Sequence, residues 1–253
     1  MRTVEAIYTA PVKSLDLIRP ETVRVDFGGI IEDRRFYLIA SNGALLTQRQ
    51  IGPLVQVKAD YRAEPEWLRL EFPSGNAIDG PVEVGECIVT RIWGRRVPGN
   101  VVTGDWSSAL YDFYQQPMRL VRSHLPGQCY DEFPISILSQ ASVDTLEQLW
   151  SGPATIGEKR FRPNFSLGGC QPHEEDEWLG RAIQVGDELL VRVMARDPRC
   201  AITTHDPETG SPDVDTLRLI LSYRPHLGAP YFGVYGMVER PGNVSVGDQV
   251  TIL

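Results

Sequence analysis

The segment around Cys200 holds the residue types best suited to chemistry in this sequence. Cys200 directly follows Arg199, and hydroxyl side chains and an Asp-Pro pair come next, in Ala201-Ile202-Thr203-Thr204-His205-Asp206-Pro207. A guanidinium beside a thiol favours the thiolate form. A thiolate binds soft metals and can also attack a substrate as a covalent nucleophile. By itself, Cys200 is more often a small core residue beside a surface arginine, so the segment needs support from elsewhere in the chain.

Three further segments carry side chains that suit an anionic ligand. Arg160-Phe161-Arg162-Pro163-Asn164 places two arginines at alternate positions, so that a strand-like path would turn both to one face. Guanidinium forks bind phosphate, and the Asn164 amide suits a hydrogen-bonding heterocycle. Pro11-Val12-Lys13-Ser14 adds a lysine and a hydroxyl, and Asp33-Arg34-Arg35 adds Arg35, which we expect to face the same site. Each segment also has an ordinary interpretation as a solvated turn or a surface ion pair.

The chain is acidic overall, so a local cluster of cations would indicate a binding site for an anion. The 253 residues carry a net charge of -8, and Lys13, Lys58 and Lys159 are the only lysines among 25 cations. Nucleic acid is therefore an unsuitable partner, because proteins that bind it present basic surfaces. An acidic protein that binds an anion has to collect its arginines at one place.

Composition also sets expectations about compartment. No stretch approaches the ~18 apolar residues of a membrane span, and the N-terminal sequence has no signal-like segment. The four cysteines form no Cys-x-x-Cys pair and no disulfide framework. We therefore expect a cytoplasmic monomer with reduced thiols and no membrane association.

The elements that must position these residues are mostly short strands. Alternating apolar runs end at Gly, Asn and Pro clusters, as at Val23–Phe27, Arg35–Ile39, Trp67–Phe72 and Ile88–Trp93. Three short helices are predicted: Ser107–Tyr114, one capped by Ser139 and running to Trp150, and one capped by Ser211 and ended by Pro225. The pattern predicts an α+β, mostly β chain of two domains, 1–100 and 101–253, divided near a Gly/Pro cluster at Gly94–Gly104.

Together these segments resemble the MOSC family, the molybdenum cofactor sulfurase C-terminal-like proteins, and within it the mitochondrial amidoxime-reducing component and its bacterial relatives. Arg162-Pro163-Asn164 and the string Arg199-Cys200 with Asp206-Pro207-Glu208-Thr209-Gly210 match the MOSC module. Pro11-Val12-Lys13-Ser14 and Asp33-Arg34-Arg35-Phe36-Tyr37 match the module that precedes it. The resemblance covers nearly the whole chain, and the Arg-Cys string is its most specific part.

The resemblance implies a MOSC β-barrel domain with a few helices, packed against an N-terminal β-barrel-like domain. It implies a molybdenum cofactor, a metal on one pyranopterin dithiolene, with Cys200 as metal ligand and catalytic centre. Six positions would contact the pterin or its phosphate: Lys13, Ser14, Arg35, Arg162, Asn164 and Arg199. Asp206, acidic and near the ligand, is a candidate for proton delivery, although a residue that only holds the Asp-Pro turn is the more ordinary interpretation.

Three positions depart from the family pattern. Asp197 stands where relatives often carry a second cysteine, three residues before the ligand. Phe133 occupies a place where a small hydroxyl residue is commoner, and His205 replaces a residue that is usually apolar. These departures change the charge and shape expected around Cys200.

The implied activity is that of an oxidoreductase, independent of pyridoxal phosphate, which reduces small N-hydroxylated compounds by oxygen-atom transfer to molybdenum. No four-cysteine iron–sulfur set is present, so electrons must come from a separate donor of the ferredoxin or flavoprotein type. Two alternatives remain open: a carrier that binds the molybdenum cofactor without turnover, and a sulfur-transfer protein whose Cys200 carries a persulfide and no metal.

Overall fold

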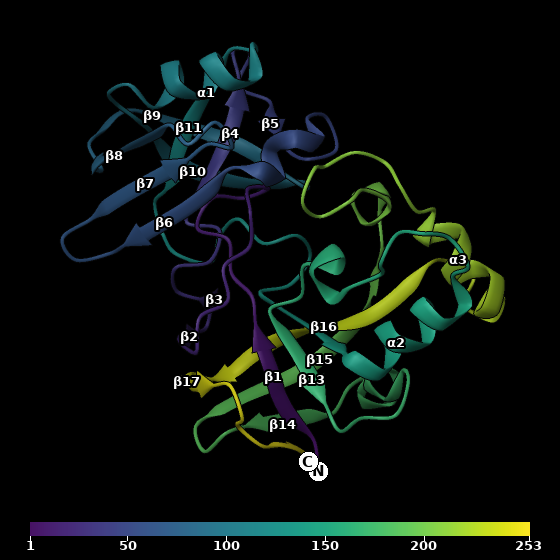
Figure 1. Ribbon diagram of the computed structural model, residues 1–253. Coiled ribbons are helices and arrows are strands. Elements are labelled where there is room, and N and C mark those ends of the chain that lie inside the picture. Colours follow the sequence, from purple (N-terminus) through teal and green to yellow (C-terminus); the bar gives the residue numbers. More distant parts are fainter.

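The computed structural model describes residues 1–253, which form two β-rich parts with few helices (Figure 1). The upper part in this view contains β4–β11, and the lower part contains β1 and β12–β18. The predicted α+β, mostly β fold is thus confirmed.

The upper part is built from two antiparallel sheets. One has five strands in the order β5-β4-β11-β10-β9, and the other has the order β6-β7-β8. Their packing follows the sequence pattern, since Leu68 and Leu70 alternate into the core while their neighbours on the strand stay partly exposed. The elements are β4 (Phe36–Ala40), β5 (Leu45–Leu46), β6 (Lys58–Arg62), β7 (Trp67–Glu71), β8 (Ala77–Pro81), β9 (Val84–Ile92), β10 (Arg95–Val102), β11 (Met118–Ser123) and helix α1 (Trp106–Tyr114).

The lower part contains a seven-stranded sheet in the order β1-β13-β12-β16-β15-β14-β18. A bridge between Thr3 and Gln249 brings the start of β1 back toward β18, so that the sheet is almost closed. The β17-β2-β3 sheet lies beside it. The strands are β1 (Thr3–Ile7), β2 (Thr22–Asp26), β3 (Gly29–Ile30), β12 (Ile135–Ser139), β13 (Phe165–Gly168), β14 (Ala182–Val185), β15 (Leu189–Pro198), β16 (Tyr231–Arg240), β17 (Gly242–Ser245) and β18 (Val250–Ile252).

Two α-helices pack on the lower part, α2 (Gln140–Leu149) and α3 (Thr216–Tyr223). The predicted Ser139 cap is confirmed, because its hydroxyl accepts a hydrogen bond from Ser142 N at 3.3 Å. The predicted start of α3 at Ser211 is wrong: the helix begins at Thr216 and is capped by Asp215. None of the helices combines the length and apolar character needed to cross a bilayer.

Strand pairing crosses the division predicted at residue 100. β1 and β2 pair with strands from the second half of the chain, and β11 pairs with β4 and β10. Strands β1, β2 and β3 therefore belong with the lower sheets, although Val12 and Leu15 between them pack in the core of the upper part. The upper sheet in turn extends to Ser123. The connections between the two parts run past the site described next.

Candidate functional site

A cavity of about 420 Å³ collects most of the residues singled out from the sequence. Its walls come from both β-rich parts. Six predicted site residues line it: Lys13, Ser14, Arg162, Asn164, Arg199 and Cys200. Segments that lie almost 190 residues apart in the chain thus meet at one place, in a volume typical of small-molecule sites.

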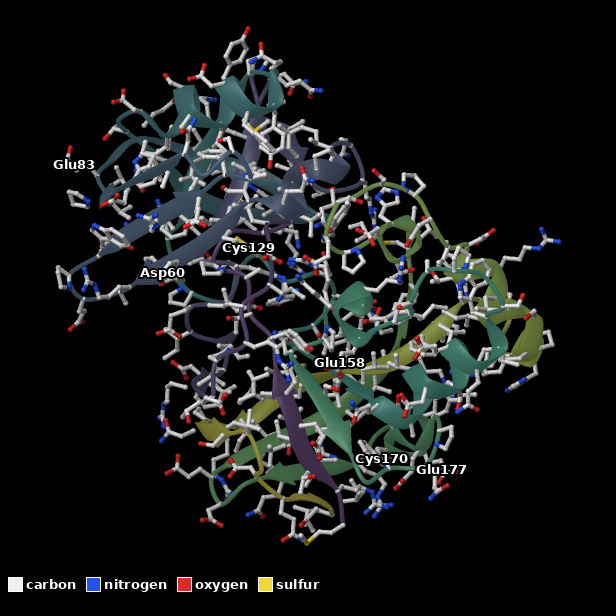
Figure 2. The ribbon with its side chains drawn as sticks, viewed as in Figure 1. Asp60, Glu83, Cys129, Glu158, Cys170 and Glu177 are labelled. Atoms are coloured by element: carbon white, nitrogen blue, oxygen red, sulfur yellow. The ribbon has the colours of Figure 1, made fainter.

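Cys200 is the only cysteine that lines the cavity, and it is partly exposed there. Cys129 and Cys170 are buried, and Figure 2 shows them in different parts of the molecule. Cys87 is exposed on β9. No three Cys, His, Asp or Glu side chains anywhere in the chain are grouped to hold a metal.

The cavity is strongly cationic although the chain carries a net charge of -8. Seven cations line it, against three carboxylates at Asp131, Glu132 and Asp197. The cations are Lys13, Arg34, Arg49, Arg95, Arg160, Arg162 and Arg199. Such an excess inside one pocket attracts an anionic ligand.

Arg199 is held by the backbone and presents one free nitrogen. Its Nε donates to Phe232 O at 2.6 Å, and Nη1 donates to Phe161 O at 2.9 Å. Nη1 also lies 2.8 Å from Asp197 Oδ2. The remaining nitrogen, Nη2, is buried without any partner. Buried donors are almost always paired, so Arg199 Nη2 marks a place for a ligand acceptor.

Lys13 and Arg162 are fixed in a similar way. Lys13 Nζ donates to Cys129 O at 2.9 Å and to Asp131 Oδ1 at 2.8 Å, and burial lowers the pKa of this lysine. Arg162 Nη2 donates to Leu15 O at 2.7 Å. Burial and the neighbouring Arg34 lower the pKa of Arg162 to about 10, so it stays charged at neutral pH. Both cations therefore face the cavity in prearranged positions.

Backbone strain is concentrated around the same cavity. Six residues other than glycine have positive φ, and four of them line the cavity: Ser14, Arg34, Trp93 and Arg162, at φ 76°, 51°, 46° and 52°. Side chains make this left-handed conformation costly, and proteins keep it where function needs it. Strained residues tend to cluster at functional sites, so this clustering supports the cavity as the functional site independently of charge.

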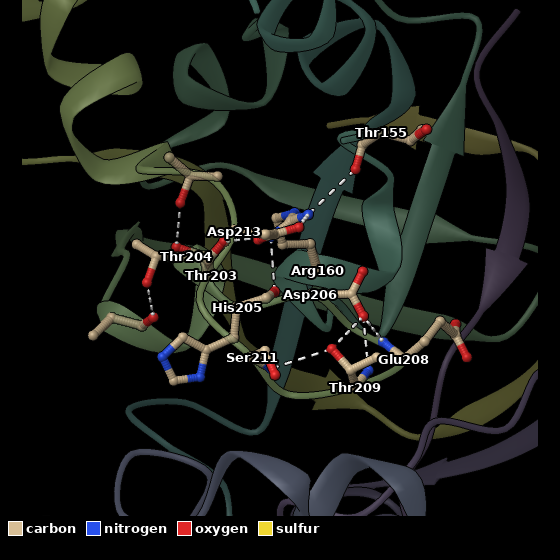
Figure 3. Close-up of polar contacts among 12 residues, drawn as sticks. Thr155, Arg160, Thr203, Thr204, His205, Asp206, Glu208, Thr209, Ser211 and Asp213 are labelled. Carbon is tan, nitrogen blue, oxygen red and sulfur yellow. Dashed lines mark hydrogen bonds and ion pairs between the residues drawn. The ribbon is translucent and has the colours of Figure 1, made fainter. Parts of the chain in front are cut away.

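The loop that carries Cys200 is anchored by Arg160 (Figure 3). Cys200 precedes the short 3-10 helix η4 (Ala201–Thr204), and Arg160 lies in another, η2 (Glu158–Phe161). The Arg160 guanidinium makes two hydrogen bonds to Asp213, at 2.6 and 2.8 Å, and a third to His205 O at 2.7 Å. Arg160 and Arg162 both line the cavity, as predicted, but they do not alternate along a strand. Arg160 lies in η2, and Arg162 follows this helix with a left-handed backbone conformation.

Two predicted site residues lie outside the cavity. Arg35 is buried beside Ser123 Oγ, 3.4 Å away, and Arg34 lines the cavity in its place. The Asp206 carboxylate accepts hydrogen bonds from the backbone of Glu208 and from the backbone and hydroxyl of Thr209. Burial raises the pKa of Asp206, but these hydrogen bonds together outweigh it and lower the pKa below its usual value. Asp206 therefore holds its own turn and does not line the cavity, an arrangement that does not favour a role in proton delivery.

Asn164 lines the cavity, but its amide is already occupied. Its Oδ1 accepts from Ser136 N and Ser136 Oγ at 3.0 and 3.1 Å, and Nδ2 donates to Asp33 Oδ2 at 3.1 Å. Asp33 Oδ1 in turn accepts from Ala10 N at 2.7 Å. Asn164 thus joins the segments that carry Arg162 and Arg34, which is a positioning role.

Asp197 is the buried acid of the site. Its residue surface is 2% exposed, and it pairs with Arg199 and Tyr235 in the cavity wall. Burial raises the pKa of Asp197 to about 6, although the Arg199 guanidinium and the Tyr235 hydroxyl act in the opposite direction. A carboxyl in this range can take up and release a proton near neutral pH.

Sequence reasoning also missed a group at the mouth of the cavity. Trp93 Nε1 donates to Asp131 Oδ1 at 2.7 Å, and the Arg49 guanidinium lies 4.4 Å from the Trp93 ring. The Arg95 guanidinium lies 4.0 Å from the Tyr130 ring. A Trp directly before Gly at a hairpin turn was the one available signal, since that position normally takes Asn or Asp.

Comparison with known proteins gives two family matches. The model described as "MOSC domain" matches residues 121–251, and the one described as "MOSC N-terminal beta barrel domain" matches residues 1–110. The chain is 29% identical to "Mitochondrial amidoxime reducing component 2" of Rattus norvegicus, over 98% of this chain and 82% of that protein. It is 28% identical to "Mitochondrial amidoxime-reducing component 1" of Homo sapiens, over 99% of this chain and 83% of that protein. A solved structure of the YUAD protein from Bacillus subtilis aligns over 100% of this chain and 96% of that chain, with 16% identity and a TM-score of 0.47.

Proposed function

The chain belongs to the MOSC family, and on this premise we propose that it is a molybdenum-cofactor-dependent reductase of N-hydroxylated compounds. Its named relatives are amidoxime-reducing components, and they align with almost all of it. The single observation that carries the proposal is the partly exposed Cys200 in a cavity lined by seven cations.

The residues present fit an anionic cofactor that carries a soft metal. Cys200 would supply the thiolate ligand, and Arg199 Nη2, buried and without a partner, would donate to the pterin or its phosphate. Lys13, Ser14, Arg34 and Arg162 would complete this cradle. When bound, the cofactor would supply the two-electron, oxygen-accepting chemistry of the reaction.

The overall reaction requires the protein to supply protons as well as ligands for the cofactor. Reduction of R-NHOH consumes two electrons and two protons and yields R-NH₂ and water, with the N–O bond broken. We propose that the Asp197 carboxyl, rather than Asp206, holds one of these protons within the cavity. Its pKa of about 6 and its place in the cavity wall support this assignment.

The electrons would come from a separate protein. Cys87, Cys129, Cys170 and Cys200 are free and are not brought together in a cluster. A donor must therefore approach the cavity from outside. The cytoplasmic location and the monomeric state stay predictions.

The proposal is tested by assaying benzamidoxime reduction in fully metallated protein, with reduced methyl viologen as electron donor. We expect benzamidine formation by the wild type, and a loss of ~100-fold or more in Cys200→Ser. Cys87→Ser, which changes a cysteine outside the cavity, is the matched control and should keep full activity. Bound molybdenum without benzamidine formation would instead identify a carrier.

A further inference from the structure

The turn between β9 and β10 presents a rigid tryptophan at the mouth of the cavity. Trp93 and Gly94 form a two-residue hairpin loop with φ 46° and 87°, the pattern of a type I′ turn. Asn or Asp would occupy the first position with less strain. Trp93 is nevertheless fixed there by Asp131 and by the Arg49 guanidinium, and it is 42% exposed while also lining the cavity.

Four arginines without an acidic partner lie on this hairpin or in the adjoining cavity wall. Arg91 and Arg96 lie directly opposite each other in the β9–β10 register, an arrangement of like charges that costs stability. Both are exposed, and neither forms an ion pair with any carboxylate of the chain. Arg49 and Arg95 are likewise without an acidic partner within ion-pair distance. Four unneutralised arginines at one rim are notable in a chain of net charge -8.

The outer face of the same hairpin is partly apolar. Val89 is 51% exposed and shares a strand face with Arg91, two residues away. It lies opposite Pro98, next to the Arg91–Arg96 pair. An apolar centre with an exposed Trp and an arginine rim has the composition of a protein–protein interface.

We propose that this hairpin surface, formed by Val89, Arg91, Trp93, Arg96 and Pro98, docks an acidic electron-transfer protein. The inference rests on the proposed function, which requires an external donor of two electrons per turnover. An acidic [2Fe–2S] ferredoxin delivers one electron at a time, so two donor molecules are oxidised for each amine and water formed. Charge complementarity would steer the donor to the rim, where Trp93 connects the outer surface with the cavity.

A small anionic substrate explains this surface less well. Such a substrate would bind inside the cavity, where Arg34, Arg49, Arg95, Arg162 and Arg199 already lie. Arg91 and Arg96 do not line the cavity, so a ligand held in it gains nothing from their direct contact. Their uncompensated charge instead matches a partner large enough to cover the hairpin.

The test compares two donors for the same molybdenum-loaded protein: a reduced acidic [2Fe–2S] ferredoxin and reduced methyl viologen, which needs no docking surface. Arg91→Glu/Arg96→Glu is expected to lower kcat/KM for ferredoxin by ~10-fold or more, while viologen-driven benzamidoxime reduction stays within about twofold of wild type. The milder variant Arg91→Gln/Arg96→Gln removes both charges without reversing them. It should show a smaller loss of kcat/KM for ferredoxin. The matched control for Arg96→Glu is Arg218→Glu, because Arg218 is an exposed arginine of α3 without an ion pair. Arg218→Glu should leave kcat/KM unchanged with either donor.

Salt supplies a second readout. Raising ionic strength from about 0.05 to 0.5 M should weaken ferredoxin-driven turnover of the wild type, and much less that of the double Glu variant. Docking at this hairpin is overturned if the double variant keeps wild-type kcat/KM for ferredoxin, or if Arg218→Glu loses as much as Arg96→Glu. It is also overturned if the wild type accepts electrons from viologen but not from ferredoxin. Failure of the wild type with viologen as well would reject the proposed function itself.

Discussion

Asp197 and Arg199 form a buried ion pair in the cavity wall, with Oδ2 and Nη1 2.8 Å apart and both side chains at most 6% exposed. Breaking such a pair leaves one charge buried alone, which is strongly destabilising. The pair nevertheless uses only one of the terminal nitrogens of Arg199, since Nη2 has no partner. Asp197 therefore holds the guanidinium in place without satisfying it.

The pH dependence of stability should report this pair. Burial raises the pKa of Asp197 from 3.8 to about 6, so between these values the folded state binds the proton more tightly than the unfolded state. Stability then falls as pH rises through this window, by ~3 kcal/mol from this group. Asp197→Asn lacks that fall, so its stability relative to wild type should improve from pH 4 to 7 in urea unfolding.

Exposed Asp187 provides the control for this experiment. Asp187→Asn should follow the wild-type pH dependence throughout. If Asp197→Asn and wild type ran parallel from pH 4 to 7, the carboxyl would not titrate in this range, and its proposed role as proton holder would be lost.

Gly233 lies tightly packed against Ile137 and Arg199. It has φ 80°, and a Cβ added there would lie 2.6 Å from Ile137 O and 3.1 Å from Arg199 Nη2. Gly43 has φ 81° with nothing within 4 Å of such a Cβ. We expect Gly43→Ala to cost ~1 kcal/mol from backbone strain alone, and Gly233→Ala ~3 kcal/mol, measured by urea unfolding. Equal costs would show that Ile137 and Arg199 can move aside to admit the added methyl group.

Arg160 should control the order of the Cys200 loop. Arg160→Met removes the bonds to Asp213 and His205 O, so we expect a loss of roughly 2–4 kcal/mol in stability. Cys200 should then react several-fold faster with iodoacetamide in cofactor-free protein, measured in a Cys87→Ser background to remove the exposed thiol. Arg218→Met is the control at an exposed site. An unchanged alkylation rate would mean that the loop is held elsewhere.

Much of the site could be predicted from local sequence. The Cys200 segment, Lys13-Ser14 and Arg162 all line the cavity, and the Ser139 cap was readable because capping depends on neighbours in the chain. The prediction that Arg35 faces the cavity is wrong because the answer depends on backbone conformation. Arg34 and Arg35 are adjacent and chemically identical, and only the positive φ of Arg34 decides which one faces the cavity. No pattern in the sequence fixes that sign.

Other differences come from contacts between distant segments. α3 starts later than predicted because residues before it are used by the Cys200 loop: Asp206 N donates to Ser211 O, and Asp213 pairs with Arg160. The sequence favours Asp206 for proton delivery because this acid lies near the predicted ligand Cys200 in the chain. The two acids differ in their surroundings: Asp197 is buried in the cavity wall, whereas the Asp206 carboxylate accepts hydrogen bonds within its own turn.

The most direct test of Cys200 as the ligand of a molybdenum cofactor is the metal content of wild type and Cys200→Ser, purified alike from a host that makes the cofactor. Plasma mass spectrometry should give about one molybdenum per wild-type chain and a clear loss in the variant, while Cys87→Ser retains the metal. Equal molybdenum in wild type and Cys200→Ser, or sulfane sulfur on Cys200 with no molybdenum in the wild type, would contradict the proposed ligand.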